Sequence, residues 1–408
     1  MLKFRDWMKT TSYANDLRLY GQPIDSAAIK NIGRTVMHRI VIFLAFVALS
    51  LVIVAGVFAQ GTCSDFVNQA LQQLSTNCGD LQRNSACYGY NHVTATFSDA
   101  LAPDAFTHPN DRVNLVDLQS ITTSPLDLQT SMWGIAVMKA QANLPDALPG
   151  QAVTFLLLGD VQVKTGVTQG SDMKPMQAVY FTTGIGSTKC TDAPESSLII
   201  QGPKDITVNM RVNGADIRLG STAVFRSTAN NTMSCGVLDG AAHVGDVNKP
   251  QVIPAGFAAR VPLDTALNAN GDWGGNQPIT DQDAAALQIL KDVPSGVLNY
   301  APDVPTPQEV DIAASLDLKL VTAFEPHLLR NMIRLLAAEG ATPAMVAEWD
   351  TPTLRTFVAN NASKVLVAAP ETTAAPDATV EPSDTPAPFT ADLLKNVLDA
   401  LDTYIGGT

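Results

Sequence analysis

The sequence predicts a mainly β fold: an antiparallel β-rich domain, preceded by an N-terminal transmembrane helix and followed by a small C-terminal α-helical module. Three observations predict it. They are an uncharged apolar run early in the chain, short alternating apolar runs between residues 93 and 265, and helix-capping motifs from residue 306 onward. With 408 residues, the chain is long enough for two or three modules that each bury a core.

The apolar run covers residues 40–59, which are all uncharged and about as many as one bilayer crossing requires. Seven Lys or Arg residues precede it and the next basic residue is Arg83, so the positive-inside rule places residues 1–39 in the cytoplasm. The body of the chain is then extracytoplasmic. The long polar segment at residues 1–39 favours an apolar run that is retained as a single-span anchor in the cell membrane. The small residues ending at Ala59 fit the alternative, a signal peptide that is cleaved to give a secreted protein.

The net charge of the chain is -13, although the cytoplasmic arm is basic, so the extracytoplasmic body is strongly acidic. Nucleic-acid binding depends on cationic groups that neutralise phosphates. An acidic body therefore argues against nucleic acid as a partner.

The five cysteines all follow the apolar run, on the side of the membrane where disulfides persist. Cys63 and Cys78 lie at the two ends of one amphipathic helix, about 22 Å apart, so they cannot bridge each other. Cys87 must pair with one of them, and Cys78–Cys87 is the shorter closure. We then expect Cys190 and Cys235 to form the second pair, which leaves Cys63 free or lipidated, although its preceding residues fit a lipidation site poorly.

The clearest β-hairpin lies in ITVNMRVNGADIRLGS, residues 206–221. A two-residue primed turn at Asn213-Gly214 places the apolar residues of both strands on one face. It also places Arg211 opposite Asp216 on the other face, an ion pair that supports the same register. The aligned apolar pairs are Val212 with Ala215, Met210 with Ile217, and Val208 with Leu219.

Further strands are predicted on both sides of this hairpin. In MSCGVLDGAAHV, a turn at Asp239-Gly240 pairs Val237 with Ala242 and Cys235 with Val244, with Cys235 facing inward. A strand with alternating apolar residues follows at residues 257–263. Upstream, QAVTFLLLGDVQV is apolar on both faces, as a central strand is.

Three of these segments, VNGADIRLGSTAVF, MSCGVLDGAAHV and VIPAGFAARV, together resemble the FecR-like extracytoplasmic domain. The resemblance covers residues 206–261 and lies in glycine turns and alternating apolar positions. It implies an extracytoplasmic sensing, scaffold or envelope-interaction role without catalysis.

Helix signals dominate after residue 265. Thr280 caps a short helix. Thr306, Thr342 and Thr351 each precede a proline at a helix start, and a further helix begins at Pro326 and is closed by Gly340, which together predict a small four-helix bundle. The predicted organisation is a cytoplasmic arm (1–39), the apolar segment (40–59), a cysteine-rich helix and loop (60–92), the β-rich domain (93–265), a loop and short helix (266–305), the bundle (306–361), a Pro/Thr/Ala-rich linker (362–389) and an amphipathic helix (390–405).

Candidate catalytic residues are scattered along the sequence. His92, His108, His243 and His327 match neither a HExxH motif nor a nucleophile–histidine–acid order, and Asp160 has no second carboxylate near it. A Lys-Thr-Gly at 164–166 and Ser-Asp-Met-Lys at 171–174 occur in the wrong order for a penicillin-binding serine acyltransferase. We predict no catalytic or cofactor-binding residues.

Metal-binding patterns are also missing from the sequence. A zinc site needs a CxxC motif or a Cys/His cluster at ligand spacing, and residues 268–274 lack the glycine position and closing glutamate of a calcium loop. We therefore predict no metal ligands.

The function expected from the sequence is that of a non-catalytic cell-surface protein, membrane-anchored or secreted, with a binding, scaffolding or envelope-associated role. Its expected partners are the membrane and either a protein or a surface polysaccharide. The first alternative is a FecR-type transmembrane signalling regulator that acts through residues 1–39. The second is an extracytoplasmic hydrolase, which requires that His92, His108 and Asp160 converge in one pocket.

Overall fold

The computed structural model describes residues 63–98, 104–141, 151–167, 174–185, 190–204, 206–294, 296–365 and 390–407. The chain divides into two compact units, residues 1–61 and 62–408, and the described residues all belong to the second. The predicted cytoplasmic arm and apolar segment lie outside the described residues. Within the described ranges, no helix has the length and apolar character to cross a membrane.

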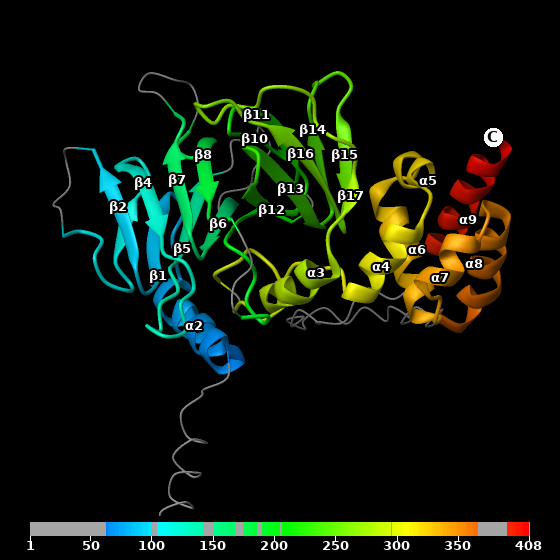
Figure 1. Cartoon of the computed structure of the whole chain (residues 1–408), viewed down its shortest axis with the longest axis horizontal. Helices are drawn as coiled ribbons and strands as arrows, with labels where there is room; N and C mark the ends of the chain where they lie inside the picture. Colours follow the sequence, from blue (N-terminus) through cyan, green and yellow to red (C-terminus); the bar gives the residue numbers. More distant parts are fainter. Residues whose placement is uncertain are drawn as a thin grey trace, which may run out of the picture. The chain divides into compact units, whose positions relative to one another are not determined.

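Two large β-sheets form the body of the second unit (Figure 1). Every pairing between the described strands is antiparallel except the parallel contact of β8 with β10. The nine-stranded sheet has the order β17 (Gln277–Pro278), β16 (Phe257–Pro262), β13 (Thr232–Asp239), β12 (Thr222–Thr228), β9 (Ser197–Gln201), β6 (Ala152–Leu158), β5 (Ile135–Gln141), β1 (Ser85–Tyr90) and β3 (Arg112–Asn114). The eight-stranded sheet has the order β15 (Gln251–Pro254), β14 (Ala241–Val244), β11 (Ala215–Leu219), β10 (Val208–Val212), β8 (Ala178–Thr183), β7 (Val161–Thr165), β4 (Leu118–Thr123) and β2 (Val93–Phe97).

The two sheets share one apolar core, and the nine-stranded sheet has a second core on its other face. Phe181 and Phe225 meet edge to face across the shared core, with ring centroids 6.1 Å apart. The second core lies under α2 (Cys63–Cys78), α3 (Asp281–Leu287) and the 3-10 helix η1 (Gln288–Lys291). The central strand predicted for QAVTFLLLGDVQV is in fact two strands, β6 and β7, which lie in different sheets. The prediction holds for β6, which is buried at all seven positions because it has a core on each side.

The hairpin at Asn213-Gly214 has the predicted register at every pair from Val208–Leu219 to Val212–Ala215. Both turn residues have positive φ, 45° and 74°, as a primed turn requires. The Asn213 side chain, which the sequence left unassigned, accepts a hydrogen bond from the Phe181 N–H at 2.7 Å and donates one to its C=O at 3.0 Å. An asparagine side chain thus replaces a missing backbone partner between β8 and β10.

The second predicted hairpin is wrong, because β13 and β14 belong to different sheets. Strand β13 pairs with β12 and β16, whereas β14 pairs with β11 and β15. Asp239-Gly240 is therefore a corner at which the chain passes from one sheet to the other. Cys235 does face inward, as predicted, since it is fully buried in the shared core. The alternating apolar pattern predicted a hairpin because β13 and β14 both direct their apolar residues into the shared core, but they do so from opposite sheets.

The disulfides are Cys78–Cys87 and Cys63–Cys190, with Cα atoms 5.9 and 5.8 Å apart. The first is the shorter closure that the sequence favoured. The expected Cys190–Cys235 pair and the expected free Cys63 are corrected: Cys235 faces the shared core, whereas Cys190 is buried in the second core, on the other face of the nine-stranded sheet. Burial raises the pKa of the Cys235 thiol to about 12, so this cysteine is an unreactive core residue.

The C-terminal helices follow most of the predicted capping signals. Thr280, Thr306 and Thr342 cap α3, α4 and α7 through their side-chain oxygens, but the cap of α8 is Asp350, whose Oδ1 accepts from the Thr353 N–H. A fifth short helix, α5, was not predicted. The bounds are α4 (Pro307–Ser315), α5 (Leu318–Ala323), α6 (Pro326–Ala338), α7 (Pro343–Glu348), α8 (Thr351–Val365) and α9 (Ala391–Gly406).

Helix α9 packs against α6 and α8, and its apolar stripe buries Val397 and Leu401. Arg355 on α8 holds Asp402 on α9 through both carboxylate oxygens. The amphipathic stripe predicted for residues 390–405 is therefore covered by this chain itself.

Candidate ligand-binding groove

A polar groove of about 480 Å³ lies on the outer face of the nine-stranded sheet, beside α3. Its floor is made by β12, β13 and β16, and its rim by the start of α3 and the glycine-rich segment before β17. We call it the Arg226–Arg260 groove. The polar side chains that line it include Glu195, Arg226, Ser227, Thr228, Ser234, Arg260, Gln277, Thr280 and Asp283.

The register of the three floor strands places two arginines on either side of a serine. Ser234 on β13 is the cross-strand partner of both Arg226 on β12 and Arg260 on β16. Adjacent strands lie about 4.8 Å apart, so the two arginine backbones are separated by roughly 10 Å. The next positions along the floor, Gly236 and Ala258, are small. The groove therefore has a low floor with a cation at each side.

Arg226 is held rigidly and its charge is already compensated. Its side chain is only 13% exposed, its Nε donates to the Ser197 hydroxyl at 2.7 Å, and its Nη1 contacts Asp283 at 2.5 Å. Glu195 lies 3.7 Å from the same nitrogen. Arg226 thus fixes α3 to the sheet and forms one wall of the groove.

Arg260 is exposed, in contrast, and no acidic group among the described residues lies within ion-pair distance of it. Its backbone is fixed, since its C=O accepts a hydrogen bond from the Gly274 N–H at 2.8 Å. Arg260 therefore provides the uncompensated positive charge of the groove.

A second groove of about 350 Å³ lies on the outer face of β10, β11 and β14. It contains the predicted Arg211–Asp216 pair, with Nε and Oδ1 2.9 Å apart, and His243. Burial and then the nearby Arg218 lower the pKa of His243, so the imidazole is neutral at neutral pH. The Arg211 charge is already paired with Asp216, whereas Arg218, which also lines this groove, has no ion pair among the described residues.

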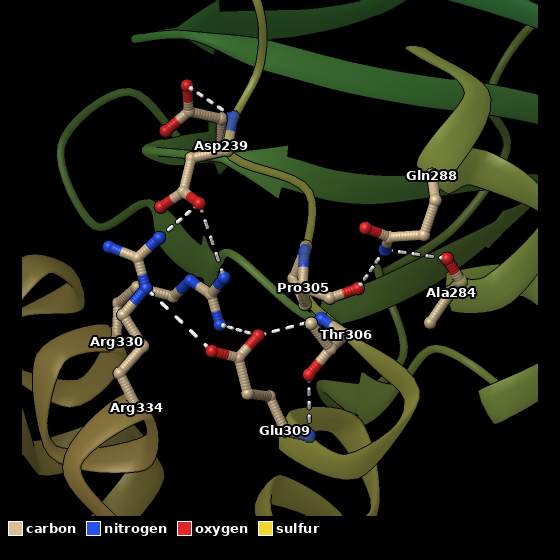
Figure 2. Close-up of polar contacts among 9 residues, drawn as sticks. Asp239, Ala284, Gln288, Pro305, Thr306, Glu309, Arg330 and Arg334 are labelled. Carbon is tan, nitrogen blue, oxygen red and sulfur yellow. Dashed lines mark hydrogen bonds and ion pairs between the residues drawn. The ribbon is translucent and has the colours of Figure 1, made fainter. Parts of the chain in front are cut away.

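A cluster of charged residues joins the helical module to the sandwich, and we call it the junction cluster (Figure 2). Arg330 on α6 is bonded to Glu309 on α4 at 3.0 Å, and both side chains are nearly buried, 9% and 11% exposed. Arg334 pairs with Asp303, whose backbone N–H donates to the Asp239 carboxylate at the sheet corner. The cluster thus ties two module helices, the preceding segment and the end of β13 together.

Glu309 and Asp239, two acids of the junction cluster, have opposite pKa shifts. Burial is the largest influence on Glu309 and opposes its ionisation, but Arg330, the Thr306 N–H and Arg334 together lower its pKa below the ordinary value. Burial raises the pKa of Asp239, and the hydrogen bond from Asp303 only partly offsets it. Glu309 is therefore a stable carboxylate, whereas Asp239 is a carboxylate under strain from desolvation.

Of the candidate catalytic residues, His92, His108, His327 and Asp160 line neither groove. His92 is an exposed turn residue with φ 59°, His108 pairs with Asp111 on the surface, and His327 lies on α6. Asp160 is exposed at the turn after β6. His243 lines the second groove. The Lys-Thr-Gly motif lies in and just after β7, and residues 171–173 of its partner motif lie outside the described residues.

No group of three potential metal ligands occurs in the described part of the chain, including residues 268–274. Asn268 there accepts a hydrogen bond from the Tyr180 hydroxyl at 2.8 Å, and Asp264 caps the turn. These residues are engaged in folding the loop.

Sequence reasoning missed Arg226 and Arg260. The available signal was one arginine in each of two largely apolar strands, TAVFRST and FAARVP, at positions that alternation directs away from the shared core. Their neighbourhood depends on β13 lying between them, which the mistaken hairpin concealed.

Comparisons with known proteins give only distant matches. No protein-family model and no curated protein matches the chain. Two crystal structures of a protein from Parabacteroides distasonis, described as a "putative anti-sigma factor", are similar at 13% identity, with TM-scores of 0.23 and 0.22. These matches cover 40% and 39% of this chain and 60% and 59% of the other, so this chain spans less than two thirds of the length of the protein it matches.

Proposed function

We propose that this is a non-catalytic binding protein whose disulfide-stapled β sandwich lies outside the cytoplasm, either anchored through residues 40–59 or secreted after cleavage. The observation that carries the proposal is the Cys63–Cys190 disulfide. Cys63 follows the apolar segment by four residues, and a disulfide at this position persists only in an oxidising compartment. The membrane-proximal end of α2 is thereby fixed to the β domain.

Binding rather than catalysis is supported by the chemistry of the Arg226–Arg260 groove. Its described lining offers hydroxyls, amides and charged groups but neither histidine nor cysteine. A serine without a neighbouring base is a hydrogen-bonding group and not an activated nucleophile. The rigid sheet beneath presents these groups in a fixed arrangement, as a recognition site requires.

The FecR-type signalling regulator stays a prediction, because it depends on residues 1–39, which lie outside the described residues. Its test is deletion of residues 2–34, which should abolish a transcriptional response while export continues.

The proposed location can be tested by peptide mass spectrometry under non-reducing conditions on the full-length protein expressed in cells. We expect a linked peptide pair containing Cys63 and Cys190. A matched variant lacking residues 40–59 should stay in the cytoplasm and yield both cysteines reduced. Reduced cysteines in the unaltered chain, together with protection of its body from protease added to intact spheroplasts, would overturn the proposal.

A further inference from the structure

We propose that the Arg226–Arg260 groove binds a small polyhydroxylated carboxylate, the chemistry of a uronic acid sugar. The carboxylate contacts Arg260, and the hydroxyl groups contact Ser234 and the acids beside Arg226. This inference rests on the proposed function, since it names the ligand class of the binding site described above.

The charge balance of the groove points to a carboxylate. Arg226 is neutralised by Asp283 and Glu195, whereas Arg260 has no acidic partner in the described part of the chain. A guanidinium group matches a carboxylate through two parallel hydrogen bonds. The protein is strongly acidic and repels anions in general. One uncompensated arginine can balance the charge of one carboxylate, but not that of a polyanion.

The shape of the floor leaves room for a ring beside that carboxylate. Ser234 lies between the arginines, and the next row of the floor is Val224, Gly236 and Ala258, in which only Val224 has a bulky side chain. A Cβ added at Gly236 would lie 3.0 Å from Val224 Cγ1, so glycine keeps this part of the floor low. The volume of the groove, about 480 Å³, is within the range of small-molecule sites.

The remaining polar groups suit hydroxyls. The Glu195 and Asp283 carboxylates are 39% and 25% exposed, so each retains oxygen surface that can accept from a ligand hydroxyl. Ser234 and Thr280 offer hydroxyls that donate and accept, and Gln277 offers an amide. No aromatic ring occurs in the described lining, so recognition proceeds through hydrogen bonds rather than stacking.

The test is titration of the full-length protein in detergent with D-glucuronate, D-glucose and acetate, followed by calorimetry or ligand-observed NMR. We expect glucuronate to bind at least tenfold more tightly than either glucose or acetate. Arg260→Gln should weaken glucuronate binding by about 10- to 100-fold, the value of a charged hydrogen-bond pair. The matched control, Arg218→Gln on the other sheet, should leave binding unchanged.

Three results would each overturn the inference: no glucuronate binding, equal affinity for glucose and glucuronate, or undiminished binding by the Arg260→Gln variant. Equal affinity for acetate would remove the role of the hydroxyls and overturn it too. A second variant, Ser234→Val, should weaken glucuronate by filling the floor without changing charge. Any of these failures with the Cys63–Cys190 link intact would refute the ligand class and leave the proposed location standing.

Discussion

Two helical regions are attached to the same sandwich by different chemistry. At the N-terminal side, α2 is fixed to β1 by Cys78–Cys87 and to the segment before β9 by Cys63–Cys190, with apolar residues beneath it. At the C-terminal side, the helical module has apolar contacts as well but no covalent link in the described part of the chain. Its polar attachment is the junction cluster (Figure 2).

The two attachments are therefore sensitive to different solution conditions. A disulfide is insensitive to salt and mild acid but is lost on reduction. A buried ion pair withstands reduction, yet it depends on both partners remaining charged. The attachment of α2 is therefore the one that changes of pH and ionic strength do not disturb.

The largest loss of stability is expected when the Cys63–Cys190 disulfide is removed, and a smaller one when Cys78–Cys87 is removed. Replacing Cys63 and Cys190 with alanine opens a closure of 127 residues and should lower the free energy of unfolding by about 4–5 kcal/mol. Replacing Cys78 and Cys87, a closure of nine, should cost about 2–3 kcal/mol. Urea unfolding of both double variants measures this, and equal costs would show that the gain does not come from loop closure.

A smaller effect is expected from breaking the junction cluster. Glu309→Gln leaves Arg330 without its nearest buried partner and should cost about 3 kcal/mol. Hydrogen exchange should then accelerate in α4 and α6 while α2 keeps its protection. The matched control is Lys395→Gln, which removes an exposed pair and should cost less than about 1 kcal/mol. Faster exchange in α2 would show that the two attachments are not independent.

The smallest effect concerns pH at the junction cluster. Burial raises the pKa of Asp239, so its contribution to stability is present at low pH and is lost as the pH rises through the raised value. Asp239→Asn should therefore raise stability at pH 7 by less than about 1 kcal/mol, with no gain once the pH is well below the ordinary aspartate pKa, where the carboxyl is protonated in both states.

Glu309 provides the contrasting half of this experiment. Because its pKa is lowered in the folded state, ionised Glu309 stabilises the fold. This stabilisation is complete above the ordinary glutamate pKa and is lost as the pH falls through the lowered pKa. Thermal unfolding between pH 3 and 8 measures both. A constant difference between Asp239→Asn and the unaltered chain across this range would contradict the assignment.

The hairpins show how far local sequence reasoning extends. Asn213-Gly214 and Asp239-Gly240 carry the same kind of turn signal, and both are flanked by alternating apolar residues. The first is a hairpin in one sheet and the second is a corner between two sheets. Turn chemistry fixes the local backbone, but the partner of the following strand depends on competition among all edges of the sheets.

The groove depends on that same competition. Alternation alone directs Arg226, Ser234 and Arg260 away from the core, but only the order β12–β13–β16 places them side by side. Asp283 completes the site because α3 packs against this face, which brings Asp283 to Arg226 across 57 positions of the sequence. Such contacts bring together distant parts of the chain and leave no periodic signal in any one of them.

Sequence patterns correctly predicted the elements whose stabilising contacts are local: the 208–219 hairpin, the amphipathic helix between Cys63 and Cys78, and the threonine caps of α3, α4 and α7. These depend on hydrogen bonds and apolar faces within a few residues. Three features depend instead on the tertiary structure: Cys63 meets Cys190, Cys235 stays in the core, and Arg260 lines the groove without an acidic partner among the described residues. The reason is that sheet order and long-range contacts follow from packing the whole chain at once, which balances core burial against the entropy of closing long loops.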